Sequence, residues 1–351
     1  MIRNLLIDPL NKSSSHLFFN ASVISGIVKT ETALIGDLSH IEELKPIQPE
    51  LNYLPYGPSG VLNGIFKSLY ILTGKAAFRK RNILFLCFDN TIIPLVLIML
   101  YPVFFRSCLS LIIHNNLTTL KTNKIKRFAY RLLVTVYKAN VYVMSKQMKR
   151  IYDLDVESIN KSILLPHPNY SRLIKFDKAE GLLTDSNKIN VIAVGRQAKL
   201  IIDFLRDFPL ESFTNIRFTI VHREKIKAFE SKNVTIINKR LSYDEYYTML
   251  SEANFALFAL DNTVEHRASG ILMDCISLQC AVIAPCTGHF LEYENMGIGY
   301  FYTNYADLKN IFQTINNNPQ MDVAGWTEGF KQALSYSAPG NFDRILFNRQ
   351  K

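Results

Sequence analysis

Short apolar runs of strand length recur along almost the whole chain, separated by stretches long enough for a helix. They read IRNLLID, TALIG, NILFLCF, CLSLIIH and VYVM in the first half, and INVIAVG, IRFTIVH, VTIIN, NFALFAL, AVIAP and GIGYFY in the second. Apolar strands that alternate with helices form parallel sheets covered on both faces. Since 351 residues exceed one ordinary core, we expect an α/β protein with two doubly wound parallel-sheet domains.

The two sets of strands set the expected domain boundaries. The periodicity lapses after Ile163, through LLPHPNY and GLLTDSN, and returns near residue 188. We predict an N-terminal domain over residues 1–165, a linker over 166–187, a C-terminal domain over 188–336 and a terminal helix over 337–351.

Cysteine usage and the N-terminus indicate a cytoplasmic protein. The five cysteines form no CxxC pair and stand in apolar runs, as free thiols do in a reducing compartment. The start, MIRNLLIDPL, reads as a first strand and not as a signal peptide. The stretch Thr91–Phe105 is short of the roughly twenty residues of a membrane span and contains two prolines, which favours a buried or interfacial helix.

Charge is distributed very unevenly. Between Leu51 and Tyr152 the only acidic residue is Asp89, against fifteen Lys and Arg. A field of one sign indicates an anionic partner such as phospholipid headgroups, nucleic acid or a phosphorylated substrate, unless it is simply a solvated basic face.

Two segments of this region are predicted to be amphipathic helices, Gly60–Lys80 and Lys124–Lys138. In the second, Lys124, Arg127 and Arg131 share one face, and the predicted apolar face consists of Ile125, Phe128, Ala129, Leu132, Leu133 and Val136. Basic helices with interleaved aromatic residues suit an anionic membrane surface. They also suit RNA, but no RNP-like strand, zinc spacing or recognition helix accompanies them, so no nucleic acid is expected.

Several short motifs follow one another in a fixed order. They are LIIHNN, VYVMSKQMKRIY, LLPHPNY, VIAVGRQAK, LSYDEYYTMLSEANFALFAL and HRASGILMDCISLQCAVIAP. In this order and spacing the chain resembles the GT-B glycosyltransferases, in particular the family 4-like (group 1) sugar transferases of bacterial surface polysaccharide and lipopolysaccharide.

The resemblance implies two Rossmann-like domains that face each other across a cleft, with the terminal helix packed back on the N-domain. It implies sugar transfer from a nucleotide diphosphate sugar to a lipid-linked or growing saccharide acceptor in cell-surface polysaccharide biosynthesis, at the inner face of the cell membrane. A nucleotide-sugar epimerase of the same fold and a non-catalytic glycosyltransferase-like subunit are the alternatives.

Ser269 and Gly270 directly precede the apolar helix ILMDCISL. Their N–H groups would be unpaired at its N-terminus, where a diphosphate binds well; a plain Ser N-cap is the alternative. Asp274 follows one turn later, and the resemblance implies contact with the ribose hydroxyls. A buried structural carboxylate is the other interpretation.

Gly195 ends the first C-domain strand, and Arg196 and Lys199 follow it at the edge where open sheets bind ligands. Fixed cations there would stabilise a diphosphate leaving group, and two solvated basic side chains are the alternative. The family's lysine usually lies two residues farther on, so the loop is shortened. Arg267 replaces a glutamate of many retaining members, with Glu265 nearby, so retention or inversion stays open.

His114 ends an N-domain strand, and the resemblance implies that it contacts the donor or the acceptor. A structural histidine with its hydrogen bonds satisfied is the alternative. An inverting enzyme needs a general base, for which Asp89 and Asp8 end strands at the same edge; both could equally be loop caps. The triplet at Asp153 follows a helix and not a strand, and no His/Cys/carboxylate cluster stands out, so neither a metal nor another cofactor is expected. The absence of GxGxxG disfavours a nicotinamide enzyme.

Overall fold

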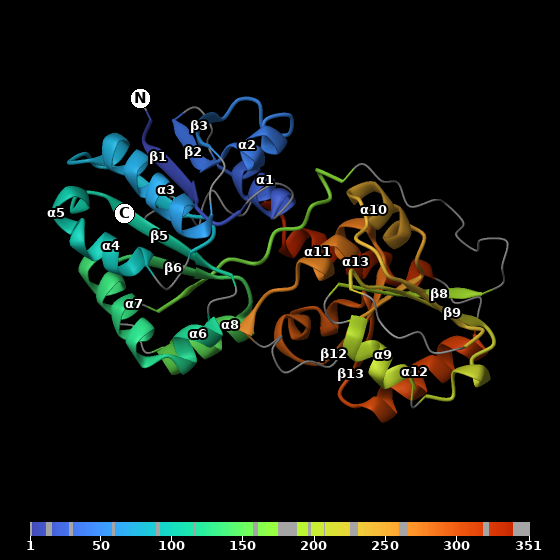
Figure 1. The fold of residues 1–351 in the computed structure, drawn as a ribbon. Coiled ribbons are helices and arrows are strands. Elements are labelled where there is room, and N and C mark those ends of the chain that lie inside the picture. Colours follow the sequence, from blue (N-terminus) through green and yellow to red (C-terminus); the bar gives the residue numbers. More distant parts are fainter. Residues whose placement is uncertain are drawn as a thin grey trace. The chain divides into compact units, whose positions relative to one another are not determined.

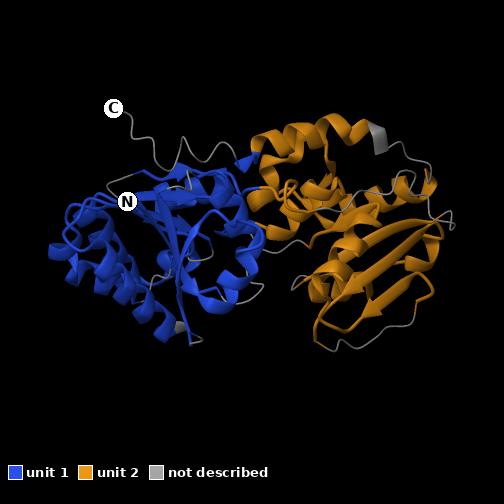
Figure 2. Cartoon of the chain, turned by 90° about the horizontal axis from the view of Figure 1, so that it is seen from above, with its two compact units in different colours: residues 1–168, 265–268, 337–351 blue, residues 169–264, 269–336 orange. Residues whose placement is uncertain are grey.

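A computed structural model gives the structure of the chain. It describes residues 2–11, 16–27, 31–57, 60–88, 92–114, 117–156, 161–174, 188–195, 198–206, 208–224, 231–259, 266–318 and 323–339. The described residues divide into two compact units (Figure 2). Unit 1 contains the residues up to Pro168 together with 266–268 and 337–339, and unit 2 contains 169–259 and 269–336.

Unit 1 is built on one parallel sheet with the strand order β3-β2-β1-β4-β5-β6-β7 (Figure 1). The strands are β1 Asn4–Asp8, β2 Thr32–Asp37, β3 Asn52–Tyr56, β4 Asn82–Phe85, β5 Cys108–Ile113, β6 Asn140–Val143 and β7 Ile163–Leu164. β1 pairs with both β2 and β4, in a register that aligns Leu6 with Leu34 and Leu84. The chain order reverses between β1 and β4, and ligands of open sheets bind at the carboxyl ends of the strands beside such a reversal.

The helices of unit 1 lie on both faces of this sheet. They are α1 Leu17–Ser25, α2 Leu38–Leu44, α3 Val61–Ala76, α4 Ile93–Met99, α5 Tyr101–Phe104, α6 Leu117–Thr122, α7 Lys124–Tyr137 and α8 Lys146–Ile151, followed by a π-helical turn, η1 Tyr152–Val156. Because parallel crossovers are right-handed, α3, α4, α5 and α7 cover one face, while α1 and α2 cover the other. In agreement, α4 packs against α7 and α1 against α2.

Unit 2 repeats the same plan with the strand order β10-β9-β8-β11-β12-β13, all parallel. The strands are β8 Ile189–Val194, β9 Ile216–Val221, β10 Val234–Ile237, β11 Phe255–Leu257, β12 Ala281–Pro285 and β13 Gly299–Tyr302. The helices are α9 Ala198–Arg206, α10 Tyr243–Ser251, α11 Gly270–Leu278, α12 Tyr305–Asn317 and α13 Thr327–Tyr336, with short turns η2 Leu210–Ser212, η4 Gly288–Glu292, η5 Glu294–Met296 and η6 Val323–Trp326. Here the order reverses between β8 and β11.

The predicted α/β class with two parallel sheets is confirmed, and each apolar run named from the sequence contains a strand. Two strands were missed. β3 lies at the sheet edge, is partly exposed and contains Pro55, and β7 is only two residues long. The predicted helix over 337–351 lies outside the described residues from 340 onward, and the same holds for 175–187 of the predicted linker.

None of the described helices is long and apolar enough to cross a bilayer. Within Thr91–Phe105 the structure has the two short helices α4 and α5, separated at Leu100, and each has a proline in its first turn. Ile93 and Leu97 are buried whereas Met99 is exposed, so the segment is partly core and partly surface.

The predicted apolar face of α7 is wrong in part. The buried residues are Ala129, Tyr130, Leu133 and Val134, whereas Ile125 and Phe128 are 82% and 68% exposed. The helix carries two apolar arcs, and the sheet buries the one that contains Tyr130, whose hydroxyl reaches that of Tyr152 at 3.1 Å.

Candidate functional site

The carboxyl edge of the unit 2 sheet brings β8 against the start of α11. Gly195, directly after β8, has φ +82°, and a Cβ built there would lie 2.9 Å from Cδ1 of Ile271. Both the left-handed conformation and this close approach require glycine. Two segments that the sequence separates by some seventy residues, one with Gly195 and one with Ser269 and Gly270, therefore meet at the point where the strand order reverses.

Ser269 caps α11, and its hydroxyl accepts a hydrogen bond from Leu272 N at 3.2 Å. The prediction that its own N–H is unpaired is wrong, because that group donates to Nδ1 of His289 at 3.1 Å. Within the described part of the chain, the N–H groups of Gly270 and Ile271 have no acceptor. A Cβ on Gly270 would meet nothing within 4 Å, so there is open space beside these N–H groups at the positive end of the helix.

Asp274 is buried between α10 and α11. Its Oδ2 accepts from the Tyr246 hydroxyl at 2.7 Å and its Oδ1 from the Tyr247 hydroxyl at 3.0 Å. Burial raises the pKa of Asp274 to about 7, and the two tyrosine hydrogen bonds oppose this rise. Since the chain's own hydroxyls engage both oxygens, the geometry is that of a buried structural carboxylate. Ribose binding by Asp274 stays a prediction.

The remaining predicted donor residues are distributed as follows. Lys199 is exposed in the first turn of α9, and Arg267 is half-buried with partners inside the protein. Arg196 and Glu265 lie outside the described residues. Their roles, like that of Lys199, stay predictions.

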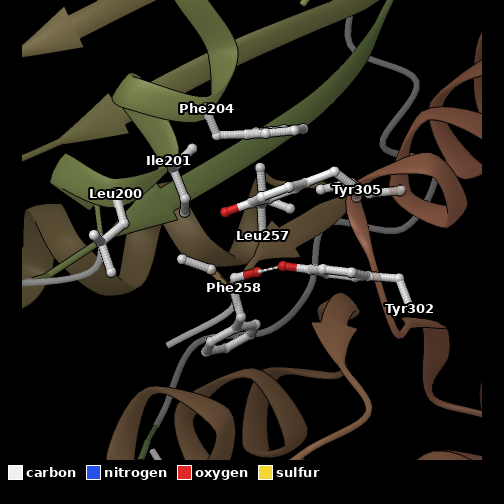
Figure 3. A pocket seen from close by; sticks show the side chains of 9 residues that line it. Leu200, Ile201, Phe204, Leu257, Phe258, Tyr302 and Tyr305 are labelled. Carbon is white, nitrogen blue, oxygen red and sulfur yellow. Dashed lines mark hydrogen bonds between the residues drawn. The ribbon is translucent and has the colours of Figure 1, made fainter. Parts of the chain in front are cut away.

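A small cavity between α9 and α12 in unit 2 has about 10 Å³ open to the centre of a water molecule, which is room for about one water (Figure 3). The rings of Phe204 and Tyr305 stack at its wall with centroids 4.5 Å apart. The Tyr302 hydroxyl donates to the Phe258 carbonyl at 2.6 Å, so its polar end is already satisfied. The lining is mostly apolar, and the space is far smaller than a typical ligand site. We therefore do not assign a whole nucleotide sugar to this cavity.

In unit 1, His114 follows β5 and lies in a cluster of rings. Its ring centroid is 4.1 Å from that of Phe19, 4.8 Å from that of His16 and 6.3 Å from that of His167. His114 is buried, and its Nε2 has no hydrogen-bond partner among the described residues. Burial, and next the neighbouring imidazoles, lower the pKa of His114 well below its usual range.

The two other histidines of this cluster are also neutral near pH 7. Burial lowers the pKa of His167 to about 3, although its ring Nδ1–H donates to the Pro168 carbonyl at 3.1 Å. Burial likewise lowers the pKa of His16. A neutral imidazole has one donor and one acceptor nitrogen. The cluster can therefore exchange hydrogen bonds with the hydroxyl groups of a ligand, whereas it carries no charge to pair with an anion. Neither His16 nor His167 was predicted as a site residue, although each follows a strand at the carboxyl edge.

Asp8, one of the two candidate bases, is fully buried, and both of its carboxylate oxygens already accept hydrogen bonds from the chain. Its Oδ1 accepts from Asn11 N at 3.2 Å, and its Oδ2 accepts from the side-chain amides of Asn11, at 2.8 Å, and Asn20. The Asn20 amide also lies 2.9 Å from Nε2 of His40. The same nitrogen of His40 lies 3.6 Å from Oδ2 of Asp8. This geometry corresponds to a structural cap. Asp89, the other candidate, lies outside the described residues.

Among the described residues no group of three or more His, Cys, Asp or Glu side chains could hold a metal ion. Asp153, in the triplet that mimics a metal motif, instead accepts hydrogen bonds from Lys149 Nζ at 2.6 Å and from the Ser162 N–H and hydroxyl at 2.9 and 2.7 Å.

Comparison with known proteins places this geometry in a structural class. No family model and no curated protein matches the sequence. Solved structures match along the whole chain. Anabaena HepE, in complexes with UDP and with UDP-glucose, is 11% and 10% identical, with a TM-score of 0.69 and 98% of both chains covered.

Two further solved structures agree. The sucrose-phosphate synthase of Thermosynechococcus elongatus is 13% identical, with a TM-score of 0.62 and coverage of 98% of this chain and 96% of that one. The glycosyltransferase of kitacinnamycin is 11% identical, with a TM-score of 0.54 and coverage of 99% and 98%. At these identities the likeness establishes the fold, and the predicted GT-B glycosyltransferase fold is confirmed.

Proposed function

We propose that this chain is a glycosyltransferase that transfers a sugar from a nucleotide diphosphate sugar to an acceptor hydroxyl. The observation that carries the proposal is the close approach of Gly195 to Ile271, which places the end of β8 beside the N-terminus of α11. Similarity of the whole chain to HepE, a protein that binds UDP and UDP-glucose, supports the same class of donor.

In this proposal the diphosphate lies at the N-terminus of α11. The N–H groups of Gly270 and Ile271 donate to its oxygens, and Arg196 and Lys199 supply positive charge. As the bond between the sugar and the diphosphate breaks, negative charge grows on the leaving group. Donors and cations already in position stabilise that charge without reorganisation.

Unit 1 provides the acceptor side of the reaction. His114, neutral at pH 7, donates or accepts a hydrogen bond at a sugar hydroxyl. If the enzyme inverts, Asp89 is the preferred general base, because the oxygens of Asp8 are already engaged by asparagine amides. The reaction requires neither a metal nor a cofactor beyond the donor.

We further propose that the acceptor is lipid-linked or a growing saccharide, and that the enzyme works in cell-surface polysaccharide biosynthesis. It would attach peripherally to the inner face of the cell membrane. The excess of Lys and Arg between Leu51 and Tyr152 supports an anionic surface as the partner.

Calorimetry with nucleoside diphosphates tests the donor site. Arg196→Ala should weaken binding by about 1.5–3 kcal/mol, the value of a hydrogen bond to a charged group. Arg206→Ala is the matched control, since this exposed arginine of α9 pairs with Asp203 at 3.2 Å and should leave the affinity unchanged. Unaltered affinity in the Arg196 variant would remove that residue from the site.

Product analysis with a panel of sugar nucleotides tests the reaction itself. A new glycoside on a saccharide or lipid acceptor is the expected product. Release of an epimerised sugar would instead identify an epimerase. Tight donor binding with no product from any acceptor would favour a non-catalytic subunit.

A further inference from the structure

Unit 1 exposes a set of large apolar side chains on three helices. On α3, Phe66 and Tyr70 are 54% and 81% exposed; on α4, Met99 is 79% exposed; and on α7, Ile125 and Phe128 are 82% and 68% exposed. We call these five residues the apolar face. Single exposed apolar side chains are ordinary on a protein surface, but gathered ones rimmed by polar residues mark an interaction site.

The three helices that carry the apolar face are neighbours on one side of the sheet (Figure 1). α4 packs against α7, and the Tyr137 hydroxyl of α7 donates to the Leu97 carbonyl of α4 at 2.6 Å. Just beyond the end of α3, Phe78 N donates to the Val103 carbonyl of α5 at 2.9 Å.

Each helix turns a different apolar arc toward the sheet. Leu69 and Leu72 of α3, Leu97 of α4 and Leu133 of α7 are buried. The spacing of Phe66 and Tyr70 by four residues, and of Ile125 and Phe128 by three, puts each pair on one outward stripe. The apolar face therefore points away from the core and is not needed to hold unit 1 together.

Exposed basic residues lie on or next to the helices that carry the apolar face. Lys75, Arg79 and Lys80 are exposed at the end of α3, and Lys124 is exposed at the start of α7. The Arg106 guanidinium lies over the exposed Phe105 ring, 5.2 Å from its centroid. The sequence contains no Asp or Glu from residue 51 to residue 152 other than Asp89. The charge therefore selects an anionic partner.

Of the anionic partners, a phospholipid bilayer fits both features. Aromatic and aliphatic side chains enter the boundary between headgroups and acyl chains, while Lys and Arg around them meet the headgroups. A nucleic acid would also bind the Lys and Arg side chains. Its nucleobases, however, would find neither stacking nor hydrogen bonds at the aliphatic Met99 and Ile125. A purely electrostatic attachment would leave the apolar face without a role.

We propose that unit 1 docks on an anionic bilayer by inserting the apolar face into the headgroup–acyl boundary. This deepens the proposed function, on which the choice of membrane rests, and it revises the basic face of α7. Arg127 donates to the Asp155 carbonyl at 3.0 Å and Arg131 to the Val156 carbonyl at 2.6 Å, so both fasten η1 and are not the bases that meet lipid.

Co-sedimentation with vesicles of phosphatidylglycerol and phosphatidylcholine tests the docking in the absence of any donor. The triple variant Phe66→Ser, Met99→Ser, Phe128→Ser takes one exposed residue from each helix and should keep the fold. We expect its partition coefficient to fall at least tenfold, which equals about 1.4 kcal/mol.

The matched control replaces three exposed apolar residues of unit 2, as Leu200→Ser, Tyr243→Ser and Leu291→Ser. Its partition coefficient should stay within about twofold of the parent, as expected for surface changes outside an interface. Equal losses in both triples, no loss in the first, or no vesicle binding by the parent would overturn the proposal. The last result, together with self-association that the first triple abolishes, would assign the apolar face to a second copy of the chain.

A fluorescent reporter separates insertion from adhesion to the headgroups. The chain has one tryptophan, Trp326, which packs on Phe255 and Tyr300 in unit 2. Phe128→Trp adds a second at the apolar face, and lipids brominated on their acyl chains should quench the added emission but not that of the parent.

Salt gives the second criterion. At 1 M salt, charge is screened within about 3 Å, so insertion predicts that a measurable bound fraction persists. Complete release at 1 M salt, or no quenching of the added tryptophan, would overturn insertion. UDP calorimetry on the same variants reports on unit 2 alone. A parent that binds UDP but no vesicles would refute the docking and leave the proposed function standing. A parent that binds vesicles but no UDP would refute the proposed function.

Discussion

Replacing Gly195 by alanine perturbs the point where β8 meets α11. At φ +82° an L-residue occupies the left-handed region, which costs about 1–2 kcal/mol. The new Cβ would also lie 2.9 Å from Cδ1 of Ile271, well inside the roughly 3.5–4.0 Å separation of carbon atoms at contact. Displacing that methyl adds on the order of 1 kcal/mol. We expect Gly195→Ala to lower the free energy of unfolding of unit 2 by about 2–3 kcal/mol.

A double-mutant cycle isolates the contact from the backbone strain. Ile271→Val removes the Cδ1 atom that the new Cβ would meet, and alone should cost about 0.5–1.5 kcal/mol. In the Ile271→Val background the cost of Gly195→Ala should fall by about 0.5–1.5 kcal/mol, because only the strain remains. Gly270→Ala is the control, since a Cβ there meets nothing within 4 Å and should not lower stability.

Urea unfolding followed by Trp326 fluorescence measures these differences in unit 2, where the indole packs on two aromatic rings. A cost of Gly195→Ala below about 0.5 kcal/mol would refute the reasoning. So would a cost that Ile271→Val leaves unaltered. Either result would mean that Gly195 does not pack against Ile271 of α11, and the proposed diphosphate site would lose its geometric basis.

Two pH dependences follow from buried groups. The pKa of Asp274 is about 7 in the folded chain against an ordinary 3.8. The free energy of unfolding should therefore fall as the pH rises from about 4 to about 7, by up to about 1.4 kcal/mol per pH unit. Asp274→Asn should abolish that slope in Trp326-monitored urea titrations; a persisting slope would assign it to another group. Because the pKa of His167 is lowered to about 3 from 6.5, stability should fall as pH drops from 6.5 toward 3. His167→Gln should reduce this loss in circular-dichroism titrations, and an unchanged profile would contradict the assignment.

The core strands could be predicted because continuous apolar runs leave few alternatives once their length is fixed. The edge strand β3 could not, because Asn52–Tyr56 is partly solvated and contains a proline, and so lacks that signal. The second apolar arc of α7 was misassigned for a related reason. Periodicity locates apolar stripes on a helix but does not say which stripe the sheet covers, and here Tyr130 and Leu133 are buried while Ile125 and Phe128 are not.

For the candidate site, features formed by residues close in the sequence could be predicted, and contacts between distant residues could not. The cap at Ser269 and the glycine after β8 are local features with local signals, and both were found. The hydroxyls on Asp274 come from residues 27 and 28 positions away. Two of the rings around His114 belong to Phe19 and His167, which are far apart in the sequence. No local pattern encodes such contacts, so burial, and with it the pKa of each group, could not be read from the sequence.

The distribution of hydrogen bonds narrows the chemistry that each edge can perform. Asp8 lies at the end of β1 and Asp274 lies in α11, and each accepts hydrogen bonds at both oxygens from the chain itself. Within the described residues, the groups at these edges without a hydrogen-bond partner include the N–H groups at the start of α11 and Nε2 of His114. Backbone donors at a helix N-terminus bind anions, and a neutral imidazole binds hydroxyl groups. A polyphosphate and a polyol are the ligand chemistries that this combination recognises, and a nucleotide sugar contains both.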